Sequence, residues 1–138
     1  MTYEQTLNYL YASQPAFHLQ GAAAYKPGLE NTCLLMEHMG NPHCQFRSIH
    51  IAGTNGKGST SHLIAAALQA AGYKVGLYTS PHLVDFRERI RINGQMVPEE
   101  YVVQFIAEHR LFLENVKPSF FETTMAGFLI FCSATGGY

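Results

Sequence analysis

A glycine-rich segment that carries one lysine shows the clearest chemistry in this sequence of 138 residues. Glycines permit positive φ angles and close approach of the backbone, so successive N–H groups can converge on an anion. Lys57 can reach the β- and γ-phosphates of a nucleotide, and a hydroxyl of Ser59 or Thr60 can hold magnesium. We therefore predict a nucleotide-binding loop with Lys57 as its catalytic residue. The loop consists of Gly53, Thr54, Asn55, Gly56, Lys57, Gly58, Ser59 and Thr60.

The elements on either side of this loop must position it. Polar and apolar residues alternate over residues 47–52, which predicts a short strand, and residues 74–78 predict another. Between them, the alanine-rich residues 59–71 predict a helix that Gly72 closes. This order predicts a right-handed βαβ unit with parallel strands. The positive end of the helix would then face the glycine loop.

The loop departs from the general phosphate-loop pattern GxxxxGK[ST]. That pattern requires a glycine at position 51 and a hydroxyl at position 58, where this chain has Ile51 and Gly58. The segment reads GxxGKG[ST] instead. A glycine-rich turn with a chance lysine is the alternative, and the predicted strand and helix around the segment favour the nucleotide loop.

Other local signals predict the remaining elements. Helices are expected at residues 3–13, 29–39 and 98–115 and after residue 119, with a hairpin at Asn93 and Gly94 and a loop at residues 16–28. Thr2 with Gln5, and Ser119 with Glu122, form the capping-box pattern. In the second helix, the expected buried stripe is Cys33, Leu35, Met36 and Met39.

Composition narrows the class of function. Apolar residues make up 47% of the chain and charged residues 14%, which is typical of a globular domain, and the net charge of -1 gives no basic face for nucleic acid. Three cysteines form no disulfide pattern, and no leader or spanning segment is evident. We expect a cytoplasmic protein that acts on small molecules, without nucleic-acid or membrane partners.

Several segments together resemble a known family. Residues 50–60 are similar to the nucleotide loop of the Mur-ligase superfamily, and residues 72–83 narrow the resemblance to its folylpolyglutamate/dihydrofolate synthase branch. Residues 87–94 and 120–124 are similar to segments that follow the loop in that branch. The similar segments before the loop are 27–30 and 40–42, and the resemblance extends to about residue 131.

The resemblance implies an ATP-dependent amide ligase with ATP and Mg²⁺ as cofactors. Dihydropteroate or a reduced folate would be converted to an acyl phosphate, which the amine of L-glutamate then attacks. The resemblance also implies that Ser80 and Glu122 are magnesium ligands. It further implies that the loop at residues 16–28 lies near the pterin group of the substrate. A third magnesium ligand and a carbamylated lysine lie downstream in the family.

The resemblance also implies an α/β fold, with a phosphate-loop domain whose parallel sheet core is flanked by helices. We expect residues 1–46 to form N-terminal helices and a substrate-side loop, and residues 47–138 an incomplete ATP-binding domain without the C-terminal domain. The sheet would be truncated before it is complete. The chain alone is therefore expected to be inactive and to self-associate through the sheet edge.

The same residues also allow simpler structural interpretations. Glu122 can serve only as a cap, and Ser80 before Pro81 can be an ordinary turn residue. His50 is expected to pack within its strand, and the charged residues of the segment 87–91 to be solvated. The alternative functions are another phosphate-loop phosphotransferase or ATPase, and a non-catalytic nucleotide-binding fragment.

Overall fold

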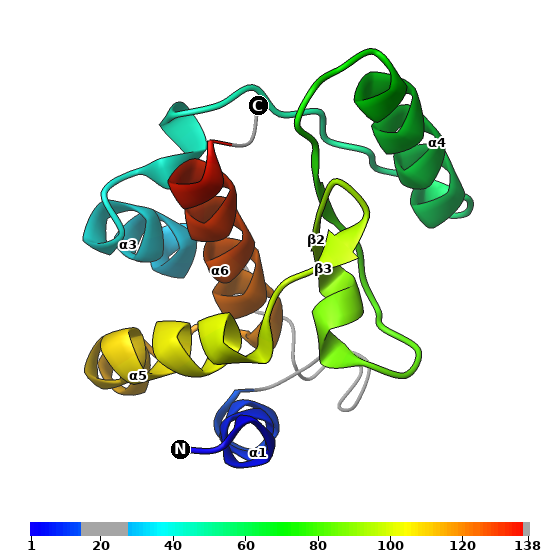
Figure 1. Cartoon of the computed structure of the whole chain (residues 1–138). Helices are drawn as coiled ribbons and strands as arrows, with labels where there is room; N and C mark the ends of the chain where they lie inside the picture. The colour runs from blue at the N-terminus through cyan, green and yellow to red at the C-terminus, as the bar shows by residue number, and fades with distance from the viewer. Residues whose placement is uncertain (15–27, 137–138) are drawn as a thin grey trace. The chain divides into compact units, whose positions relative to one another are not determined.

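The computed structural model describes residues 1–14 and 28–136, so the predicted loop at 16–28 lies outside the described residues except for Gly28. The chain, drawn in Figure 1, divides into two compact units. The helical unit consists of Met1–Asn41 and Pro98–Gly127, and the sheet unit consists of Pro42–Val97 and Phe128–Tyr138. Each unit is described by itself below.

Helices form the whole of the regular structure described in the helical unit. They are α1 (Tyr3–Ser13), α3 (Glu30–His38), α5 (Glu99–Val116) and the first half of α6 (Phe120–Thr135). Figure 1 shows α1 next to α5. Burial of large apolar side chains, at roughly 1.5–3 kcal/mol each, holds these helices together. The buried apolar side chains are Leu10, Leu35, Met36, Val102, Phe105, Ile106, Leu113, Phe120 and Ala126.

The predicted helix ends are largely confirmed. Thr2 and Gln5 form the capping box of α1, in which the Gln5 amide donates to Thr2 Oγ1 over 3.2 Å. Gly40 follows α3 with a φ of 74°, as expected for a residue that ends a helix. The predicted stripe of α3 was wrong at Cys33, which is exposed, because α3 buries Leu35 and Met36 instead.

The sheet unit contains a small antiparallel sheet. Its strands are β1 (Gly76–Tyr78), β2 (Ile90–Ile92) and β3 (Gln95–Met96), in the order β1-β2-β3. The predicted hairpin is confirmed: Asn93 and Gly94 have φ angles of 49° and 79°, which a tight turn of type I′ requires. Asn93 also accepts a hydrogen bond from the Val75 amide at Oδ1 over 2.9 Å, which ties the turn to the approach of β1.

The predicted βαβ unit is not present in the described residues. The fold class is confirmed as helices with a small sheet, but all three strands are antiparallel. Residues 47–52 form no strand, Ile49 is 64% exposed, and His50 is exposed rather than packed. Alternation gives a segment a preference for the strand conformation, but a strand also needs a hydrogen-bonded neighbour. None of the hydrogen bonds found among the described residues supplies one here.

The second half of α6 packs on β1 within the sheet unit. Tyr78 lies 5.7 Å from Phe128, ring centroid to ring centroid. Cys132 is buried, and this burial raises the pKa of its thiol to about 12, so the thiol stays protonated and unreactive. Gly76 allows the close approach, since a Cβ there would collide with Cys132 Sγ and lie 3.2 Å from Phe128.

We expect Gly76→Ala to lower the free energy of unfolding by about 1–3 kcal/mol, because the added methyl group overpacks this contact. Gly58→Ala is the matched control. A Cβ at Gly58 meets nothing within 4 Å, and alanine favours the helix by about 0.5–1 kcal/mol. Urea unfolding of both variants measures the difference, and equal effects would contradict the packing described here.

Candidate functional site

The predicted nucleotide loop leads directly into α4 (Lys57–Ala70). This helix begins at Lys57, two residues before the predicted start. Gly56 is its N-cap, with a left-handed backbone at φ 75° and ψ 6°, and no side chain caps the first turn. The first amides of a helix have no partner inside the helix, and the helix dipole adds about half a positive charge at the same end. The loop therefore presents amides that suit a phosphate.

Lys57 reaches back across the loop. Its Nζ donates to Gly53 O over 2.7 Å and to Thr54 O over 3.3 Å. The ammonium group is thus held at the start of the loop by two neutral carbonyls. A phosphate oxygen carries a negative charge, so its hydrogen bond to the ammonium group gains a stronger Coulomb attraction than a neutral carbonyl offers. Lys57 is therefore placed to exchange these carbonyls for a phosphate.

The whole loop is open to solvent. The residues from Gly53 to Thr60 are all exposed, so a ligand can approach the amides, the lysine and the hydroxyls directly. Ser59 and Thr60 occupy the first turn of α4 and offer hard oxygen donors, which suit magnesium. The predicted loop residues thus lie together in one continuous segment.

A second loop of the sheet unit, at residues 79–85, is held by one carboxylate. Glu88 accepts hydrogen bonds from the amides of Leu83, Val84 and Asp85 over 3.0, 2.9 and 2.8 Å. These bonds lower the pKa of Glu88 to about 2. Ser80, the predicted magnesium ligand, lies in this loop and is exposed.

Arg89 was wrongly predicted to be solvated. It is only 2% exposed, and its Nε donates to His82 Nδ1 over 2.8 Å, so His82 must carry its ring proton on Nε2 when neutral. Arg87, a second arginine of this segment, forms a salt bridge with Asp85, in which Arg87 Nη2 lies 2.7 Å from Asp85 Oδ2. Sequence reasoning missed this arrangement, although Asp85 and Glu88 have the spacing of a capping box and form one around the short helix Phe86–Arg89.

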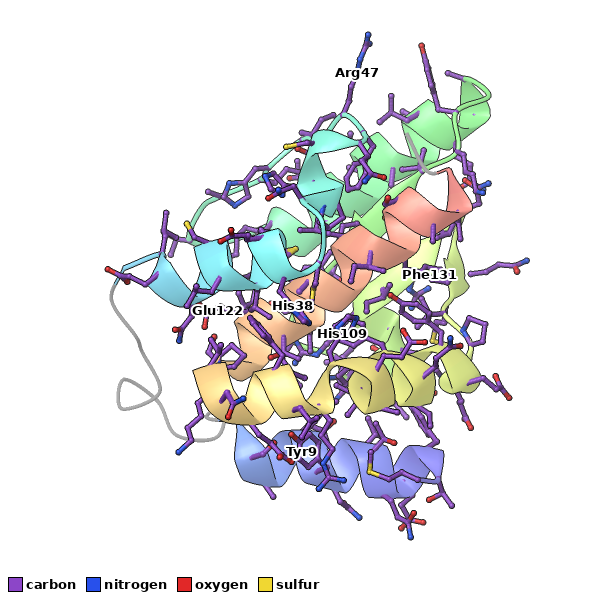
Figure 2. All side chains as sticks on the ribbon, turned by 90° about the vertical axis from the view of Figure 1, so that its left-hand side faces the viewer. Tyr9, His38, Arg47, His109, Glu122 and Phe131 are labelled. Atoms are coloured by element: carbon purple, nitrogen blue, oxygen red, sulfur yellow. The ribbon has the colours of Figure 1, made fainter. Side chains whose placement is uncertain are left out.

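Glu122 lies in the helical unit, where its predicted capping role is confirmed. The Ser119 amide and Oγ donate to Glu122 Oε2 over 2.7 and 2.8 Å, and the Glu122 amide donates to Ser119 Oγ over 3.2 Å. Thr32 of α3 donates to the other oxygen, Oε1, over 2.9 Å. Figure 2 labels Glu122 at this position. Ser80 belongs to the sheet unit, so a magnesium ion shared by Ser80 and Glu122 stays a prediction.

The described residues lack two other features. No group of three or more His, Cys, Asp or Glu side chains there is arranged to hold a metal ion. Across residues 1–14 and 28–136, no helix has the length and apolar character that a membrane crossing requires.

The low pKa of Glu88 gives a direct prediction. A depressed carboxylate pKa means that its bonds stabilise the fold above pH of about 4.5 and that this contribution is lost as the pH falls through about 2. In an NMR titration, the amide signals of Leu83, Val84 and Asp85 should shift with a midpoint of about 2. Glu88→Gln should abolish this titration, and Glu100→Gln, at an exposed carboxylate of α5, should leave it unchanged. A midpoint near 4.5 in the unsubstituted protein would contradict the arrangement.

Comparison with curated proteins finds folate enzymes. The chain is 38% identical over 131 residues to a probable bifunctional folylpolyglutamate synthase/dihydropteroate synthase of Haloferax volcanii, covering 91% of this chain and 15% of that protein. It is 49% identical over 75 residues to a dihydrofolate synthase/folylpolyglutamate synthase of Bacillus subtilis, covering 54% of this chain and 17% of that protein. No family model matches the chain.

Solved structures give the same result. The chain superposes on the crystal structure of a folylpolyglutamate synthase from Thermotoga maritima with a TM-score of 0.85 at 38% identity, covering 98% of this chain and 31% of that one. A complex of folylpolyglutamate synthase with AMPPCP and folate gives a TM-score of 0.83 at 32% identity, over 99% of this chain and 33% of that one. The chain thus spans about a third of the length of these solved proteins.

Proposed function

This chain is a relative of the N-terminal part of folylpolyglutamate and dihydrofolate synthases, and from that relationship we propose that it supplies the nucleotide-binding part of a glutamate ligase. The ligase would use ATP to join L-glutamate to dihydropteroate or to a reduced folate. The observation that carries the proposal is the exposed loop at residues 53–60, with its left-handed Gly56, uncapped α4 and inward Lys57. The neighbour with bound AMPPCP and folate supports both ligand classes.

The chemistry we propose proceeds in two steps. The acceptor carboxylate attacks the γ-phosphorus of ATP, which forms an acyl phosphate and releases ADP. The amine of L-glutamate then attacks the acyl carbon, and phosphate leaves as the amide bond forms. Negative charge on the phosphoryl oxygens has to be stabilised during the first step, and electrostatic stabilisers in fixed positions do this best.

The residues of this chain would act mainly on that charge. The amides of Gly56 to Ser59, which precede the first hydrogen bond of the helix from Thr60 N to Gly56 O, would bind phosphate oxygens. The ammonium group of Lys57 would move from the two loop carbonyls to the β- and γ-phosphates. This movement changes only side-chain torsions, because the backbone of the loop is already in place. Lys57 thereby supplies a positive charge where the transferred group leaves.

Magnesium would neutralise phosphate charge when bound, and the oxygen donors present fit such an ion. In the loop, a hydroxyl of Ser59 or Thr60 is the donor that we propose, and Ser80 and Glu122 stay the magnesium ligands that the family resemblance predicts. Both carboxylate oxygens of Glu122 already accept hydrogen bonds, from Ser119 and from Thr32. A carboxylate has about four lone-pair sites, so these bonds leave it able to accept a cation as well.

Lys57→Ala should weaken the binding of Mg·ATP by about tenfold to a hundredfold, because a charge-assisted contact is worth about 1.5–3 kcal/mol. Calorimetric titration of the two proteins measures the change. Lys117→Asn is the matched control, since it removes a lysine of the helical unit at a left-handed position that asparagine tolerates. If Lys57→Ala binds Mg·ATP as tightly as the unsubstituted protein, the nucleotide loop is wrongly assigned.

A further inference from the structure

A pair of histidines in the helical unit takes no part in the proposed function. His38 ends α3 and His109 lies in α5, and Figure 2 shows the two side chains next to each other. His38 Nε2 and His109 Nδ1 are 3.2 Å apart. His38 is exposed, so the pair can be reached from solvent.

Aromatic contacts fix the direction of both rings. His38 stacks on Phe112 with ring centroids 3.8 Å apart and an interplanar angle of 5°. His109 packs against Phe105 with centroids 5.0 Å apart, and the two imidazole planes cross at 80°. These contacts on the ring faces hold the two rings in the orientation in which the nitrogens face each other. A site whose ligands are already oriented loses less entropy when it binds.

The separation of the nitrogens matches metal coordination. Imidazole nitrogens bind Zn²⁺ at about 2.0–2.1 Å, and two nitrogens 3.2 Å apart would then subtend an angle of about 100–106° at the metal. This value lies close to the tetrahedral angle of about 109° that zinc prefers. The same distance also allows one ring to donate a hydrogen bond to the other, which is what the free protein has.

We propose that His38 and His109 form a two-histidine site for a transition-metal ion of the Zn²⁺ class, with water in the remaining coordination positions. Imidazole suits zinc, nickel and copper ions, whereas magnesium prefers oxygen. The site would be open, because the described residues contain no third histidine, cysteine or carboxylate placed to complete it. Neither histidine is one of the magnesium donors of the proposed ligase.

Binding requires a shift of one proton. Each neutral imidazole carries one N–H, and the hydrogen bond of the free pair places one of them between the rings. Coordination needs a lone pair on both facing nitrogens, so the protons must lie on His38 Nδ1 and His109 Nε2. One ring therefore changes its tautomer, and two neutral rings release no proton when the metal binds.

Calorimetric titration with ZnCl₂ in the absence of nucleotide tests the site independently of the ligase proposal. We expect one Zn²⁺ per chain, and an affinity lower by at least about tenfold in His38→Gln and in His109→Gln. His43→Gln, at an exposed histidine of the sheet unit, should bind Zn²⁺ like the unsubstituted protein. Cys33→Ser and Cys44→Ser should also retain the affinity, because the exposed thiols take no part in the site.

Equal affinity in the unsubstituted protein and either glutamine variant would overturn the proposal and leave a hydrogen-bonded histidine pair only. So would an equal loss in His43→Gln or in either cysteine variant. A second measurement does not depend on the variants folding: ¹⁵N NMR of the imidazoles of the unsubstituted protein. Zn²⁺ should shift His38 Nε2 and His109 Nδ1, and shifts confined to other histidines would contradict the site.

Discussion

The left-handed backbone at Gly56 is the constraint on which the proposed function depends. Its φ of 75° turns the chain sharply into α4 and leaves the first amides of the helix facing outward. A residue with a Cβ would be strained there by about 1–2 kcal/mol, although space is available, since a Cβ at Gly56 meets nothing within 4 Å. The glycine is thus needed for backbone conformation and not for close packing. Lys57 follows at once, so the turn that exposes the amides also directs the lysine back across them.

The sheet unit holds its second loop by a different means. Here a carboxylate of the protein itself accepts hydrogen bonds from backbone amides, as a phosphate would in the nucleotide loop. Glu88 gathers three amides, and buried Arg89 fixes the tautomer of His82. Both side chains belong to the segment between the loop and β2, and the antiparallel pairing of β2 with β1 keeps this segment in place. Ser80 thereby lies in a loop whose shape is set by the side chains of Glu88 and Arg89.

Local signals in the sequence predicted the elements that local physics determines. Capping residues marked the starts of α1 and α6, and Asn93 with Gly94 marked the hairpin, because each acts through neighbours a few residues away. The prediction of a strand at residues 47–52 was wrong, because strand pairing depends on a partner distant in the sequence that no local pattern specifies. The prediction for Arg89 was wrong for a related reason: charge predicts exposure, whereas the buried Arg89 has a polar partner in His82, seven residues earlier in the chain. The spacing of Asp85 and Glu88 is that of a capping box, and this pattern could have predicted the short helix at Phe86–Arg89.

The central claim is that residues 53–60 bind the phosphates of a nucleotide, and an NMR titration with Mg·AMPPCP tests it most directly. Backbone amide signals from Gly56 to Ser59 should shift in a saturable manner as the analogue is added, because their N–H groups gain phosphate acceptors. The amides of Thr2 and Gln5, which are capped within α1, should remain unchanged. Saturable shifts that spare the loop and appear elsewhere would contradict the account.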